Sequence, residues 1–159
     1  MKATLFTAAI ATTLLASSCK KPSEIINTPS GNNKTTASVE GKAFTAASIT
    51  AIANENNSTF LLTATDKDNN SIMISGPAQT GSFTDANGNA TQGSYIDSNG
   101  ALWMSSFGGN VTITVTKFDR TTRKMSGTFS FTGGAVETSQ ATGTRSVTGG
   151  TFTDVSFIQ

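Results

Sequence analysis

The sequence predicts an all-β protein: an antiparallel meander that forms a β-sandwich or a flattened β-barrel, preceded by a signal peptide and a flexible tether. The first indication is alternation, because Val111, Ile113 and Val115 alternate with threonines, as in a strand with one buried face. The second is punctuation, because turn signals such as Asn99-Gly100 recur at short spacing. The third is composition, since 28 Thr and 19 Ser suit solvent-facing strand positions and turns.

The N-terminus has the features of a lipoprotein signal peptide, which we place at residues 1–18. Lys2 is followed by an uncharged, mostly apolar run that is shorter than the ~20 residues of a membrane span. The run ends in Leu-Ala-Ser-Ser before Cys19, which resembles a bacterial lipobox, although the Leu stands one position further from the Cys than usual. The resemblance implies lipidation of Cys19, and two or three acyl chains anchor a protein stably. The alternative is an ordinary signal peptide with an incidental cysteine.

Residues 19–38 are predicted to form a lipidated Cys and a flexible linker, and residues 39–159 a single β domain. Two of the three prolines fall within 22–38, among Asn, Thr and Ser, and this composition cannot bury a core. Two lysines and only one acidic residue follow Cys19, which does not indicate export to the cell surface. We therefore expect a cell-envelope protein at the outer membrane facing the periplasm, with surface exposure as the alternative.

Ten strands are predicted in the domain, and the turn signals separate them. They lie near residues 39–45, 48–53, 58–65, 71–75, 80–84, 92–97, 101–106, 110–118, 123–132 and 145–157. The third is supported by Phe60, Leu62 and Ala64, which share a parity, and the fourth by Ile72 and Ile74. Their separation by an Asp/Asn-rich segment indicates a turn.

The later strands carry the clearest alternation. Met125, Gly127, Phe129 and Phe131 share one face of the ninth strand. Parity slips at Lys117/Phe118 and at Gly149-Gly150/Phe152 predict β-bulges. The segment from Gly133 to Thr144 is Gly-rich and irregular, so we predict a mobile loop there.

The aromatic residues are the expected core. Nine of the ten Phe lie in the domain, together with Tyr95 and Trp103, and a single Cys rules out internal disulfides. The burial of each aromatic side chain contributes roughly 1.5–3 kcal/mol. The phenylalanines concerned are Phe44, Phe60, Phe83, Phe107, Phe118, Phe129, Phe131, Phe152 and Phe157.

Charge and composition exclude several classes of function. A formal net charge of +1 lacks the basic surplus of a protein that binds nucleic acid through phosphates. The absence of His excludes the Ser-His-Asp triad and His-ligated metal sites. We therefore expect no cofactor, no nucleic-acid partner and no enzymatic activity.

One segment has the spacing that begins a calcium loop. Asp66, Asp68 and Asn70 follow the Asp-x-Asp-x-Asn pattern, but the positions that require Gly and Glu hold Ser71 and Pro77. The alternative, a polar hairpin turn whose side chains bond their own backbone, is favoured. We therefore predict no metal site, with this loop as the weak candidate.

Three aromatics are the candidate ligand contacts. Tyr95, Trp103 and Phe107 lie in adjacent segments, and exposed aromatics on a β face can stack on sugar rings. The alternative is that Trp103 belongs to the core.

Charged residues give two further candidates. The basic side chains of Lys117, Arg120, Arg123 and Lys124 surround one turn and suit an anion or lipid head group, or simply protect a sheet edge. A carboxylate pair for glycoside hydrolysis would have to come from acids that the sequence does not bring together. These acids are Glu40, Asp85, Asp97, Glu137 and Asp154.

The phrases SGTFSF at 126–131 and VTGGTFTDV at 147–155 resemble a family of Bacteroidota lipoproteins classified as a domain of unknown function. Val39–Phe44 opens the domain in the same style. The resemblance implies an all-β, membrane-anchored envelope protein and supplies no catalytic residues. We expect a non-enzymatic binding or structural module with a protein or glycan partner. The alternatives are a β-barrel carrier of a small apolar ligand and, more remotely, a carboxylate-dependent glycoside hydrolase.

Overall fold

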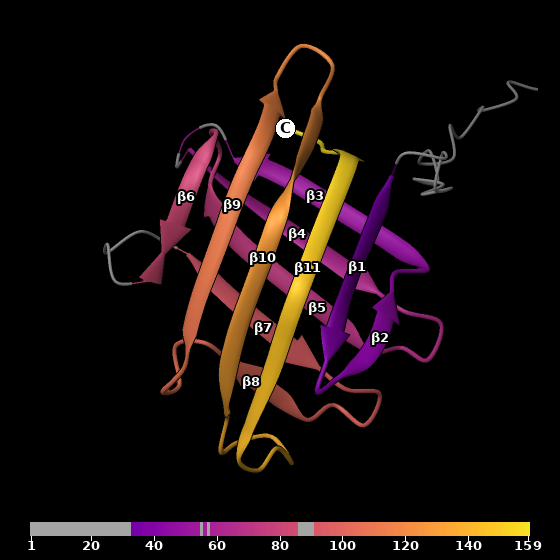
Figure 1. The fold of residues 1–159 in the computed structure, drawn as a ribbon, viewed down its shortest axis with the longest axis vertical. Helices are drawn as coiled ribbons and strands as arrows, with labels where there is room; N and C mark the ends of the chain where they lie inside the picture. Colours follow the sequence, from indigo (N-terminus) through magenta and orange to yellow (C-terminus); the bar gives the residue numbers. More distant parts are fainter. Residues whose placement is uncertain (1–32, 55, 57, 86–90) are drawn as a thin grey trace, which may run out of the picture.

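The structure, a computed structural model, describes residues 33–54, 56, 58–85 and 91–159. Within these residues, eleven strands join in one sheet that folds over into two layers (Figure 1). They are β1 (Lys34–Val39), β2 (Lys42–Thr45), β3 (Ser48–Asn54), β4 (Thr59–Thr65), β5 (Ser71–Pro77), β6 (Gly81–Thr84), β7 (Gln92–Ile96), β8 (Leu102–Met104), β9 (Asn110–Asp119), β10 (Lys124–Ala135) and β11 (Thr144–Ser156).

Strand β10 connects the two layers. Its residues from Lys124 to Thr132 pair with β9 in the front layer of Figure 1, whereas Gly134 and Ala135 pair with β8 in the layer behind. The front layer runs β6-β9-β10-β11-β1-β2, and β8-β7-β5-β4-β3 form the other. The all-β prediction is confirmed: the sheet is an antiparallel, curled half-barrel, flattened so that its two layers face each other.

The C-terminal residues connect the layers at the other side. Ile158 exchanges backbone hydrogen bonds with Ala51 and Ala53 of β3, and it forms a parallel bridge with Ile52. The N–H of Phe157 donates to the carbonyl of Arg123 at the start of β10. The end of the chain is therefore tied to both layers.

Aromatic side chains fill the space between the layers. Phe60 of β4 and Phe152 of β11 are almost fully buried, and their ring centroids lie 6.3 Å apart. The predicted aromatic core is confirmed for most of its members, but Phe107 is 50% exposed. Leu61 faces solvent, so the β4 side chains that alternate with the buried ones do not line an internal cavity. The interior of the half-barrel is therefore filled with aromatic side chains.

Both predicted β-bulges are present. The register of β9 with β10 shifts so that Thr116 has no partner between Val115 and Lys117. The register of β10 with β11 shifts opposite Gly149, whose φ of +58° a glycine adopts without steric cost. The Asn99-Gly100 turn also forms as predicted, with Gly100 at φ +83°. The other Asn-Gly pair, at residues 87–88, lies outside the described residues.

The first strand begins earlier than the composition indicates. The linker was predicted to extend through residue 38, but Lys34–Val39 form β1 and pair with β11. The single strand expected over 39–45 is instead a hairpin of β1 and β2 around Glu40 and Gly41, both of which have positive φ. Polar threonines and serines are tolerated in β1 because β11 and β2 supply its backbone partners on both sides.

The loop predicted between Gly133 and Thr144 is shorter than expected. Strand β10 continues to Ala135, and Gly134 pairs with Met104. A Cβ on Gly134 would meet the Phe107 backbone oxygen at 1.6 Å, so this glycine permits a close approach of two chain segments. Gly133 and Gly134, which indicated flexibility, are therefore packing positions at the junction of the two layers.

Within the described residues, no helix has the length and apolar character that a transmembrane span requires.

Candidate functional site

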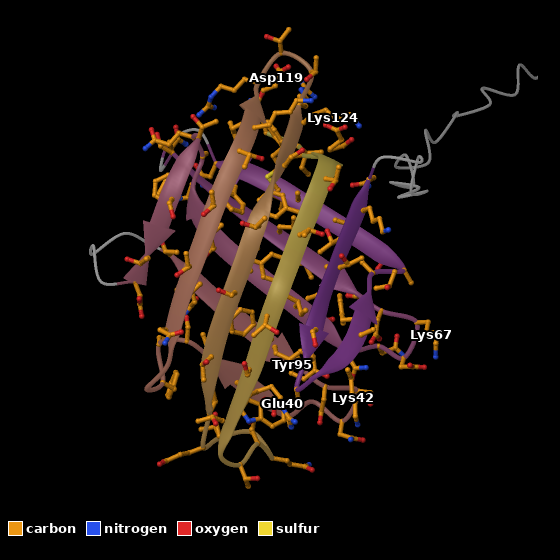
Figure 2. All side chains as sticks on the ribbon, in the orientation of Figure 1. Glu40, Lys42, Lys67, Tyr95, Asp119 and Lys124 are labelled. Carbon is orange, nitrogen blue, oxygen red and sulfur yellow. The ribbon has the colours of Figure 1, made fainter. Side chains whose placement is uncertain are left out.

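A depression lies at one end of the half-barrel, where three turns meet. Its volume is ≈ 340 Å³, and we call it the Tyr95 depression. Figure 2 shows Tyr95 at this end, with Glu40 and Lys42 from the β1–β2 hairpin nearby. The lining side chains are Val39, Glu40, Lys42, Ala43, Phe44, Asp66, Asp68, Asn70, Tyr95, Asp97 and Arg145. Hydroxyl, cationic and carboxylate groups thus converge on one concave surface.

Local side-chain hydrogen bonds hold two of the three turns that form the walls. Asp66 Oδ1 accepts the N–H groups of Asp68 and Asn70, at 2.8 and 2.9 Å. Asp97 Oδ1 accepts the N–H groups of Asn99 and Ala101 at 2.9 and 3.0 Å. These are Asx turns, in which a short carboxylate replaces a backbone acceptor. The carboxylates of Asp66 and Asp97 therefore order the turns in which they lie.

Tyr95 forms the floor of the depression. It pairs with Trp103 across β7 and β8, and the two ring centroids lie 5.9 Å apart. Burial raises the pKa of the Tyr95 hydroxyl above its usual value of 10.0, so the group is neutral at physiological pH. A neutral phenol can both donate and accept a hydrogen bond, which suits recognition of a polar ligand.

Trp103 lies behind this floor, in the core. The side chain is 3% exposed, and its Nε1–H donates to the carbonyl of Thr142 at 3.1 Å. The Arg145 guanidinium carbon lies 4.2 Å from the Trp103 ring centroid, a cation–π contact. Arg145 lines the depression, and its buried Nε has no hydrogen-bond partner among the described residues. Of this stacked pair, Arg145 is the member that reaches the depression.

Phe107 is not part of the Tyr95 depression. It lies in the connection between β8 and β9 and lines a separate shallow hollow with residues 135–138. The structure therefore brings together Tyr95 and Trp103, but not Phe107, of the three aromatics that the sequence grouped as ligand contacts.

The candidate calcium loop has the geometry of a polar hairpin turn. Besides its two backbone bonds, Asp66 accepts a hydrogen bond from the Asn70 side-chain amide at 2.9 Å. Asp68 is paired with Lys67 at 2.8 Å, and Asn70 Oδ1 accepts the N–H of Ser98. In the described part of the chain, no three His, Cys, Asp or Glu side chains are grouped so that they could hold a metal ion.

The structure brings two of the candidate acids to one surface. Glu40 and Asp97 both line the Tyr95 depression, whereas Asp154 lies near the opposite end, paired with Lys117 at 2.9 Å. Glu40 Oε1 accepts the N–H of Ser146. Lys42 and Arg145 also line the depression, and neither was predicted as a site residue. The Glu40-Gly41 dipeptide would have revealed the hairpin that positions Lys42, but Arg145 is more than a hundred residues away in the chain.

The predicted basic cluster is present at the turn between β9 and β10. Lys117 pairs with Asp154, and Arg120 lies over the Phe118 ring at 5.4 Å. Lys124 Nζ donates to the Asp154 carbonyl at 3.2 Å. Figure 2 shows Lys124 and Asp119 at the end of the half-barrel opposite Tyr95.

The hydrogen bonds of Asp119 keep this turn ordered. Its carboxylate accepts the N–H groups of Thr121 and Thr122. Hydrogen bonds from Thr122 lower the pKa of Asp119 below 3.8, and the bond from the Thr122 side chain has the largest effect. The turn thus includes one carboxylate that stays ionised among the basic side chains. The proposed lipidation residue, Cys19, lies outside the described residues.

Over residues 32–156, the sequence matches the family described as a domain of unknown function, DUF6252. The chain belongs to this family. The match begins just before β1 and ends with β11, so the DUF6252 domain coincides with the half-barrel. No curated protein and no solved structure matches the chain.

Proposed function

We propose that this DUF6252 protein is a lipid-anchored component of a bacterial cell envelope, acylated at Cys19, whose domain is a non-enzymatic module that binds an envelope glycan at the Tyr95 depression. The observation that carries the binding proposal is the mixture of groups in the lining. Lys42 and Arg145 can donate hydrogen bonds to a ligand, Asp68 can accept them, and the Tyr95 hydroxyl can do both. A glycan presents many hydroxyls that donate and accept at once, so it matches such a lining.

A carrier of a small apolar ligand is less well supported. Such a carrier needs an apolar cavity in the barrel interior or mouth. Here the Phe60 and Phe152 rings occupy the interior, and charged and polar side chains surround the depression. The polar lining therefore favours a hydrophilic ligand.

A glycoside hydrolase remains the second candidate, because Glu40 and Asp97 share the depression. Hydrolysis requires one carboxyl that is protonated and able to donate. Asp97 Oδ1 accepts two backbone N–H groups of its own turn, and Glu40 Oε1 accepts the N–H of Ser146. Both acids are thus engaged in holding backbone segments in place, which favours binding without cleavage.

The sequence before the domain supports the anchor. Cys19 follows an apolar run of signal-peptide length, and it is the only cysteine of the chain. The outer membrane facing the periplasm is the proposed location. Intact mass measurement of the protein purified from membranes tests it: the expected species begins at Cys19 and carries two or three acyl chains. A Cys19→Ala variant should leave the membrane fraction, and an unmodified Cys19 would contradict the anchor.

Native mass spectrometry of the mature protein tests the binding site. The probes are muramidase-released peptidoglycan fragments and oligosaccharides of delipidated lipopolysaccharide. We expect a discrete added mass with one probe, weakened by Tyr95→Phe and by Lys42→Gln. Lys67→Gln is the matched control, because Lys67 is at the same end but does not line the depression. An equal loss of probe binding in both lysine variants would contradict the site. Cleavage of the probe would favour the hydrolase. The absence of any added mass would point to a protein partner.

A further inference from the structure

The charges of the half-barrel are separated along its length. We call the end that carries the β9–β10 turn the basic end. Its side chains are Lys34, Lys117, Arg120, Arg123 and Lys124 against Asp119 and Asp154, a net of +3. The opposite end holds Lys42, Lys67 and Arg145 against Glu40, Asp66, Asp68, Asp97 and Glu137, a net of −2. Figure 2 shows Lys124 and Asp119 at the basic end, and Glu40, Lys42 and Lys67 toward the other. A domain whose charges nearly cancel therefore has two electrostatically different ends.

The basic end is a rigid surface. Phe118 stacks on Phe157 at 4.8 Å with an interplanar angle of 16°, directly below the turn. The Phe157 N–H bonds the Arg123 carbonyl at 3.0 Å, and Asp119 accepts two N–H groups inside the turn. The backbone that carries the cations is thus held in one arrangement before any partner binds.

Exposed apolar side chains lie beside these cations. Ile158 is 47% exposed and follows Phe157, which contacts the basic turn. Ile52, its bridge partner on β3, is 42% exposed. Basic residues next to exposed aliphatic residues suit the interface of a lipid bilayer, where head groups are anionic and the layer beneath is apolar.

The chain enters the domain at this same end. Lys34, the first residue of β1, pairs with Thr153 near the end of β11 (Figure 1). Fifteen residues along the chain separate Lys34 from Cys19. Even a fully extended chain of that length spans at most about 50 Å. An acyl anchor at Cys19 therefore keeps the basic end within reach of the membrane and at high local concentration.

We propose that the basic end docks onto the anionic phospholipid head groups of the membrane that carries the anchor, so that the Tyr95 depression faces away from the bilayer. This inference rests on the proposed acylation of Cys19. Each basic side chain close to an anionic surface multiplies the partition constant by on the order of fivefold at low salt. Docking that would be weak for a free protein becomes the prevailing orientation of an anchored one.

Fluorescence transfer from the domain to the bilayer tests this orientation. Mature acylated protein is reconstituted in vesicles of phosphatidylglycerol and phosphatidylcholine with an acceptor dye on the head groups. Because Cys19 is acylated, a donor dye attaches only to an added cysteine, Thr121→Cys at the basic end or Asn99→Cys at the other. β10 spans about 40 Å, so the two positions are well separated. We expect stronger transfer from position 121, and a smaller difference in high salt or in neutral vesicles.

Charge variants supply the matched control. Arg123→Asn with Lys124→Gln should lower the docking constant by on the order of 25-fold and remove the difference between the two labels. Lys42→Gln with Lys67→Gln removes the same charge at the opposite end and should preserve the difference. Equal transfer from both positions in unsubstituted protein, or stronger transfer from position 99, would overturn the proposal.

A flotation step before the measurement separates this proposal from the anchor. Protein that does not float with neutral vesicles carries no anchor, which contradicts the proposed function. Cosedimentation of that unacylated chain with phosphatidylglycerol vesicles then still decides the docking: sensitivity to Arg123→Asn with Lys124→Gln supports it, and no binding overturns it.

Discussion

The guanidinium carbon of Arg145 lies 4.2 Å from the centroid of the Trp103 ring. Arg145 comes from β11 in one layer and Trp103 from β8 in the other, so the contact spans the junction of the half-barrel. It also separates the core from the Tyr95 depression, which Arg145 lines and Trp103 does not. One arginine thus serves both the stability of the domain and the chemistry of its concave surface.

Arg145→Met should lower the free energy of unfolding by about 1 kcal/mol, because Met keeps the apolar stem but loses the cation–π attraction. Trp103 is the only tryptophan, so its fluorescence reports the change at the site during urea unfolding. Lys67→Met is the control, since Lys67 is exposed and pairs with its neighbour Asp68. An unchanged unfolding midpoint in Arg145→Met would show that the stacking contributes nothing.

Gly150 and Gly134 should respond differently to the same substitution. A Cβ at Gly150 would lie 2.5 Å from the Phe129 ring, whereas one at Gly134 would meet the Phe107 backbone oxygen at 1.6 Å. Gly150→Ala should therefore cost about 1–3 kcal/mol, and Phe129→Leu in the same chain should recover part of it. For Gly134→Ala we expect no rescue by Phe107→Ala, because the obstacle is backbone. Thermal unfolding of the single and double variants measures both, and strictly additive losses at Gly150 and Phe129 would disprove the clash.

Two phenylalanines should differ in their contribution to stability. Phe60 is 1% exposed and Phe107 is 50% exposed. Phe60→Ala should cost about 3–5 kcal/mol through lost burial and a residual cavity. Phe107→Ala should cost less than about 1 kcal/mol, since an exposed ring loses little apolar burial. Urea denaturation compares them, and a large loss at Phe107 would place this ring in the core after all.

The ion pair between Lys117 and Asp154 should make stability depend on pH. The hydrogen bond from Lys117 is the largest cause that lowers the pKa of Asp154 below 3.8. The carboxylate therefore stabilises the fold fully above pH 3.8, and this contribution is lost as the pH falls through the lower, folded-state pKa. The same contact raises the pKa of Lys117 above 10.5, so its contribution holds below pH 10.5 and is lost as the pH rises through the raised value.

Asp154→Asn is the appropriate variant, because Asp154 has a φ of +46° and Asn adopts such a backbone readily. The variant should be less stable than the parent at neutral pH and equally stable in strong acid. Urea midpoints at both pH values make the comparison. Asp85→Asn, at the end of β6, is the control, and a gap of the same size at both pH values would mean that the ion pair is not its cause.

Most strands could be predicted because each carries its own evidence. The alternation of Val111, Ile113 and Val115 depends only on neighbouring positions, and so does the register slip at Lys117, which correctly indicated a bulge. Strand β1 could not be predicted in this way. Its threonines and serine resemble a linker, and pairing with β2 and with β11, more than a hundred residues later, makes Lys34–Val39 a strand.

The candidate site was only partly predictable for the same reason. Tyr95 and Trp103 stood out because aromatic residues near each other in the sequence often meet. Lys42 and Arg145 reach the depression from β2 and from the start of β11, so their meeting depends on the closure of the half-barrel. The Asp66 loop, by contrast, was predicted as a polar turn from its sequence alone, and its side chains do bond their own backbone.

The pairing of the first strand with the last one has a consequence for biogenesis. Lys34 pairs with Thr153, so β1 acquires its main neighbour only when nearly the whole domain has been synthesised. Closing a loop of about 120 residues costs on the order of 4 kcal/mol in chain entropy. A nascent or truncated chain that lacks β11 leaves β1 with β2 as its partner, and the edge of β10 beside it is unpaired. The last residues of the domain to be synthesised therefore decide whether the first strand gains all its partners, and a chaperone would find its substrate in that interval.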